Sequence, residues 1–143
     1  MKMLMTIVTL PAALLAIAPT QAADESGRTK VELPAMMKEH MLSNMRDHLS
    51  ALQEIQAALA KGELGKAGDI AESRIGMSSL ASHNAAHMAP YMPKPMQDIG
   101  TEMHHAASRF AITAAEGDLP KALEGLSRVT AQCVACHASY RLN

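Results

Sequence analysis

The chain has very few aromatic side chains, with one Phe, two Tyr and no Trp among its 143 residues. A core of this composition lacks the large rings that usually fill space. Its 12 methionines, together with many alanines and leucines, must therefore supply most of the apolar volume. The formal net charge is −1 and no basic run occurs, so the composition gives little support to binding of nucleic acid or of anionic lipid.

Motifs of common enzyme classes are also missing from the sequence. The chain has no nucleophile elbow, no phosphate-binding loop and no metalloprotease motif. It has no internal repeat, and no segment shows the strict alternation of apolar and polar residues that is typical of a half-buried strand. We therefore expect a helical protein that is not an enzyme.

The first 22 residues have the organisation of an export signal. Lys2 supplies the positive charge, residues 3–18 form an apolar run, and Ala22 is a small residue suitable for cleavage, with Ala23 as the alternative. An apolar run of about 16 residues is short for a membrane span, and no later segment is long and apolar enough to cross a bilayer. We expect a signal peptide over residues 1–22 and one exported domain over residues 23–143.

The rest of the chain predicts an all-α fold. Apolar residues recur every three or four positions from Met41 to Leu59, as an amphipathic helix requires. Prolines at positions 90, 93 and 95 interrupt a later helical pattern, because proline cannot continue a helix. Short connections between helices favour an antiparallel up-down-up-down four-helix bundle. The four predicted helices cover residues 34–61, 64–88, 96–116 and 119–141.

The last predicted helix carries Cys133-Val134-Ala135-Cys136-His137, and C-x-x-C-H is the attachment sequence of c-type haem. Two cysteines three residues apart lie on nearly one face of a helix, so both thiols can form thioethers with one porphyrin. His137, one turn beyond Cys133, is then placed as the proximal iron ligand. A zinc site would need a second ligand pair, and a thioredoxin-like pair would lie near a βαβ pattern. The sequence therefore predicts one covalently bound haem c, whose buried porphyrin would supply missing apolar volume.

With this motif on the last of four helices, the chain resembles the class II cytochromes c, the cytochrome c′ family. The resemblance rests on the C-terminal position of the motif and on the closing pattern C-x-x-C-H-x-x-Y-R, which ends here at Tyr140 and Arg141. It implies a periplasmic left-handed four-helix bundle, often a homodimer, with Arg141 near the proximal imidazole. Counting back from His48, the family's basic and distal apolar haem-pocket positions fall on Lys38, where the family usually has arginine, and on Leu42.

Within this resemblance, the function depends on the other side of the iron. An apolar residue at the distal position, here Leu42, implies five-coordinate iron that binds NO or other small gases. A first-helix methionine as sixth ligand implies an electron carrier, because thioether ligation raises the reduction potential. Met45 and Met41 are the candidates, with Met45 slightly ahead. We expect a carrier of single electrons between periplasmic redox partner proteins, with a gas-binding protein as the alternative.

A second alternative comes from sulfur and imidazole side chains around the proline-rich turn. Ligands of this kind suit copper, and their cluster predicts a copper-binding module, with or without haem. The competing interpretation is that the methionines fill the end of the bundle while the histidines lie on helix surfaces. The cluster consists of His83, His87, Met88, Met92, Met96, Met103 and His104.

Overall fold

The structure is a computed structural model that describes residues 27–142. The predicted signal peptide, residues 1–22, lies outside the described residues. Most of the described chain is helical, which confirms the all-α class. Between residues 27 and 142, no helix has both the length and the apolar character needed to cross a membrane.

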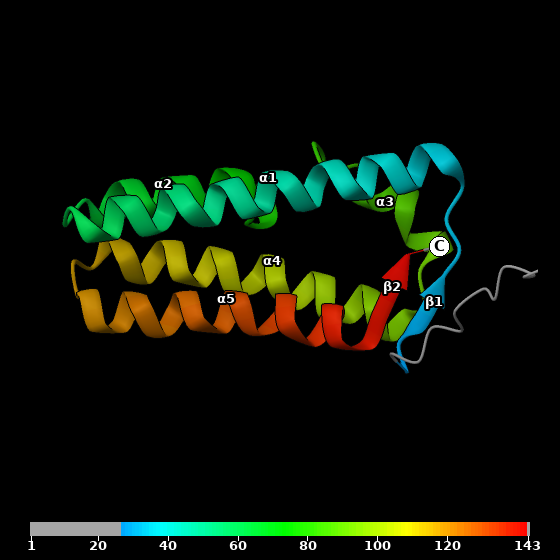
Figure 1. The fold of residues 1–143 in the computed structure, drawn as a ribbon. Helices are drawn as coiled ribbons and strands as arrows, with labels where there is room; N and C mark the ends of the chain where they lie inside the picture. Colours follow the sequence, from blue (N-terminus) through cyan, green and yellow to red (C-terminus); the bar gives the residue numbers. More distant parts are fainter. Residues whose placement is uncertain (1–26, 143) are drawn as a thin grey trace, which may run out of the picture.

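Four long helices dominate the molecule and lie side by side as two antiparallel pairs, α1 with α2 and α4 with α5 (Figure 1). Three shorter helical pieces connect α2 to α4 along the chain, and one of them, α3, lies toward the end of the molecule where α1 begins. The long helices are α1 Ala35–Ala60, α2 Leu64–Arg74, α4 Lys94–Ala115 and α5 Leu119–Ser139. The short ones are η1 Met77–Ser79, α3 Ala85–Met88 and η2 Ala89–Tyr91.

Local sequence signals account for the ends of the long helices. Pro34 precedes α1, where its missing N–H is not needed. Gly62 and Gly117 follow α1 and α4 with φ of 74° and 80°, a left-handed conformation that glycine adopts without steric cost. At the start of α5 the Asp118 carboxylate accepts a hydrogen bond from the backbone N–H of Lys121 at 3.1 Å. The sequence therefore predicts these boundaries to within one or two residues.

The main core lies where α2 packs on α1 and α4, and α4 packs on α5. The single phenylalanine, Phe110, is fully buried there. Small residues allow the helices to approach closely: a Cβ on Gly125 would lie 3.3 Å from the Phe110 ring, and a Cβ on Gly68 would lie 2.9 Å from the carbonyl oxygen of Ala111. In the described residues α1 and α5 are not among the closely packed pairs, so this side of the molecule is left for the site described below.

Two short strands join the two ends of the described chain. β1, Thr29–Val31, pairs in parallel with β2, Tyr140–Leu142, in a register that places Lys30 opposite Arg141 (Figure 1). Val31 and Leu33 are 3% and 5% exposed, within a second apolar cluster that also contains Met41, Met88 and Met96. No pattern in the sequence indicates these strands, because three residues are too few to show a strand periodicity.

The prediction of a second helix over residues 64–88 is wrong beyond Arg74. α2 ends there, Gly76 is extended, and Asn84 adopts a left-handed conformation with φ 54°. Side-chain oxygens here accept the backbone N–H groups that a continued helix would use: the Met77 N–H donates to the Ser108 hydroxyl oxygen at 2.9 Å, and the Ser78 N–H donates to a Glu72 carboxylate oxygen at 3.1 Å. Residues 77–92 therefore form an irregular layer, called the wall segment below.

Candidate functional site

A cavity of about 610 Å³ lies at the end of the molecule where α5 finishes. Its lining comes from α1, the wall segment, α4, α5 and β2, and most of the side chains are apolar. The volume is within the range of about 300–1,000 Å³ that is typical of pockets for small molecules and cofactors. The tertiary structure therefore provides a cofactor-sized space beside the C-x-x-C-H motif.

The three motif residues with side-chain chemistry lie on the face of α5 that borders this cavity. Cys133, Cys136 and His137 all line it, whereas Val134 is 68% exposed and does not. Both cysteines are free, and burial raises the pKa of each thiol, with Cys133 adding to the rise for Cys136. Reactive redox cysteines have a lowered thiol pKa, so this environment opposes that use.

The donor set of the cavity fits a c-type haem. Two thiols and one imidazole face an apolar space of cofactor size, as two thioether anchors and one axial ligand require. Within residues 27–142, no group of three or more His, Cys, Asp or Glu side chains is arranged to hold a metal ion by itself. Haem attachment at Cys133 and Cys136 and iron ligation by His137 remain predictions that this geometry supports.

All three first-helix candidates for the distal side border the same cavity. Met41 is 7% exposed, the next residue Leu42 is half-buried, and Met45 is half-buried one turn further along α1. A thioether ligand and an apolar distal residue are therefore both available from one helix. The choice between them stays a prediction, and it depends on the rotation of α1 about its axis.

Two cationic side chains line the cavity, and one of them was not predicted. Arg141 lies in the lining as expected, together with Arg28, whereas Lys38 is half-buried and outside the lining. The pairing of β1 with β2 brings the segment that contains Arg28 beside Arg141. No pattern in the sequence indicates this pairing. Guanidinium groups suit the carboxylates of haem propionates. A role for Lys38 in pairing with a propionate stays a prediction.

Three buried histidines from three different elements also line the cavity. His48 lies on α1, His83 on the wall segment and His104 on α4, with ring centroids 4.7, 5.6 and 6.1 Å apart. Burial, together with the positive charge that His83 and His104 acquire on protonation, lowers the pKa of His48 to about 4. Burial likewise lowers the pKa of His83 and His104. We call these residues the histidine cluster; they are neutral at neutral pH.

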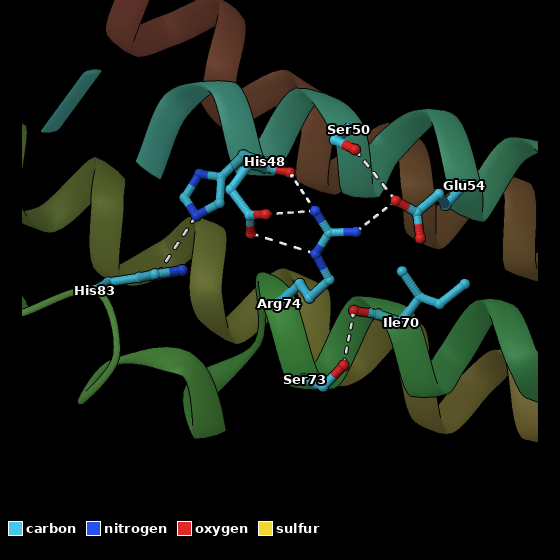
Figure 2. A network of polar contacts seen from close by, with 8 residues as sticks. His48, Ser50, Glu54, Ile70, Ser73, Arg74 and His83 are labelled. Atoms are coloured by element: carbon cyan, nitrogen blue, oxygen red, sulfur yellow. Dashed lines mark hydrogen bonds and ion pairs between the residues drawn. The ribbon is translucent and has the colours of Figure 1, made fainter. Parts of the chain in front are cut away.

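An ion-pair network fixes α1 to α2 beside this cluster (Figure 2). Arg74 of α2 donates from Nε to Asp47 at 3.3 Å and from a terminal nitrogen to Glu54 at 2.6 Å, and it also forms an ion pair with Asp47. The hydrogen bond from Arg74 lowers the pKa of the Asp47 carboxyl group. Because Asp47 directly precedes His48, the network holds this part of α1 in place.

The structure gathers most of the candidate copper ligands at the cavity. His87 is exposed and lies outside the lining. The other six residues line the cavity: His83, Met88, Met92, Met96, Met103 and His104. Thioethers in such a place also serve as flexible apolar filling around a cofactor, so copper binding stays a prediction.

Comparison of the chain with known protein families, with curated proteins and with solved structures found no match. The function is therefore argued from the cavity and from the residues that line it.

Proposed function

We propose that this protein is a periplasmic monohaem c-type cytochrome of class II that carries single electrons between redox partner proteins. One observation carries the proposal: Cys133, Cys136 and His137 share the wall of an apolar cavity of about 610 Å³. The proposal includes a left-handed four-helix bundle formed by α1, α2, α4 and α5. It also includes pairing of two copies as a homodimer, which sedimentation of the purified protein would test.

Different residues of the cavity would hold different parts of the cofactor. Cys133 and Cys136 would anchor it through two thioethers, and His137 would ligate the iron. When bound, the haem supplies reversible one-electron oxidation and reduction. Apolar side chains exclude water from its surroundings, and Arg28 and Arg141 are placed to neutralise carboxylate groups.

The mass of the exported protein tests this assignment. We expect the mature chain plus one haem that acid-acetone does not extract. Cys133→Ser and Cys136→Ser should each leave one thioether or none, whereas Val134→Ser, on the exposed side of the same helix turn, should keep both. A Cys133–Cys136 disulfide in protein matured by a competent haem-attachment system would refute the proposal.

A five-coordinate, gas-binding protein is the second candidate, and the position of Leu42 in the cavity lining favours it. The optical spectrum separates the two functions. An electron carrier with a methionine ligand has a low-spin spectrum and a weak far-red band in the oxidised state. Met45→Ala or Met41→Ala should then convert the iron to high spin, while Leu42→Ala should not. High-spin wild-type protein that binds NO readily would replace electron transfer by gas binding.

A copper-binding module remains the third candidate because six soft ligands face one cavity. Titration of the purified protein with Cu(I) against a chromophoric chelator tests it. Saturable binding of Cu(I) that Met88→Leu and Met92→Leu weaken, with no haem in the exported protein, would support this function over the first two.

A further inference from the structure

One residue of the wall segment is held by three side chains from successive turns of α1. The carbonyl oxygen of His83 accepts a hydrogen bond from Asn44 Nδ2 at 3.0 Å and lies 3.1 Å from His40 Nε2. A carbonyl oxygen can only accept, so His40 Nε2 carries the proton. The third side chain, His48, approaches the His83 ring (Figure 2).

The His83 ring has two polar contacts of its own. Its Nδ1 lies 3.4 Å from His48 Nε2 and 3.3 Å from the Ser79 hydroxyl oxygen. The Ser79 hydroxyl donates to the Gly76 carbonyl at 2.7 Å, so its oxygen is available to accept from the His83 ring. Between His48 Nε2 and His83 Nδ1, one nitrogen donates and the other accepts, so the contact needs one proton between the two rings.

These three α1 side chains lie on one face of the helix, and two of them, Asn44 and His48, line the cavity together with Met41 and Met45. His40, Asn44 and His48 are four residues apart and therefore lie above one another on the helix. Met41 and Met45 follow the first two by one position, and both line the cavity. A rotation of α1 that brought a different side chain into the cavity would break the contacts with His83.

We propose that His83 and its three α1 partners form a latch that holds the wall segment against α1 and fixes the rotation of α1. His83 is thus a positioning residue that decides which of Met41, Leu42 and Met45 meets the iron. The part of this inference that concerns the iron rests on the proposed haem function. The part that concerns the wall segment does not.

Hydrogen exchange of the purified protein tests the latch without reference to haem. Asn44→Leu removes the donor to the His83 carbonyl oxygen, and His48→Leu removes the partner of the His83 ring. In both variants we expect backbone amides of residues 85–92 to exchange at least tenfold faster. His48→Gln retains an acceptor and should restore the wild-type rates. Ile55→Ala is the matched control, because Ile55 is fully buried on the same helix but belongs to the main core. It should speed exchange in α1, α2 and α4 alike.

The latch is refuted if the wall segment stays protected from exchange in Asn44→Leu and His48→Leu. It is also refuted if these variants speed exchange equally in all helices, as Ile55→Ala should. The oxidised spectrum of the haem-loaded variants tests the positioning role. We expect the high-spin fraction to change at least twofold in Asn44→Leu and His48→Leu, and not in Ile55→Ala. Faster exchange with an unchanged spectrum would refute the positioning of the iron ligand. Wild-type protein without haem would refute the proposed function, while exchange would still decide the latch.

Discussion

Acidification should destabilise this protein by protonating a histidine that the folded chain keeps neutral. His48 is 6% exposed, and its pKa is lowered from 6.5 to about 4 by burial and by the neighbouring His83 and His104. The nearby Asp47 acts in the opposite direction, and Arg74 acts in the same direction as burial. The unfolded chain therefore binds a proton between pH 6.5 and about 4 that the folded chain does not bind.

The size of the effect follows from the same two pKa values. Stability contributed by neutral His48 is fully present above pH 6.5 and is lost as the pH falls toward 4. Between pH 7 and pH 4.5 the loss from this one group amounts to about 2 kcal/mol of unfolding free energy. Protonating His48 also places a buried charge beside His83, so the latch and the global stability should weaken together. Asp47, whose pKa is lowered, loses its contribution only at more acidic pH.

Urea unfolding at pH 7 and pH 4.5 measures this difference. His48→Gln keeps an acceptor but cannot titrate, so its acid-induced loss of stability should be smaller than that of wild type by about 2 kcal/mol. His87→Gln, which changes an exposed histidine on α3, should lose as much as wild type. Equal acid losses in wild type and His48→Gln, or an NMR titration midpoint of His48 near 6.5, would contradict the reasoning.

Three further predictions concern the scaffold, and urea unfolding checks each of them. Gly68→Ala should destabilise by about 1–3 kcal/mol, because its Cβ would meet the α4 backbone at 2.9 Å. Gly65→Ala on the same helix has open space and should instead stabilise by about 0.5 kcal/mol, so equal effects would contradict the close packing. Asp118→Ala should cost about 1 kcal/mol by removing the N-cap of α5, and Asp118→Asn should restore most of it. Arg74→Met should cost about 2 kcal/mol because it breaks contacts with both acidic partners, whereas Glu54→Gln, at an exposed carboxylate, should cost under about 1 kcal/mol.

The sequence alone was sufficient for the helix class, for most helix boundaries and for the candidate haem attachment residues. Apolar spacing, prolines and glycines act within about one helical turn, so α1, α4 and α5 could be placed without tertiary information. The shared face of Cys133 and Cys136 follows from the same local geometry. Beyond Arg74 this reasoning failed, because side-chain oxygens of Ser108 and Glu72 accept the backbone N–H groups of Met77 and Ser78 there.

Tertiary structure alone decided what surrounds the motif. His48, His83 and His104 come from three separate elements, and Arg28 reaches the cavity through a strand pairing between the two ends of the described chain. No periodicity connects residues so far apart in the sequence, because their contact depends on which helices become neighbours and how each is rotated. Five consecutive residues are therefore enough to predict a haem chemistry for the site, whereas its cavity, its buried histidines and the proposed latch arise only from packing.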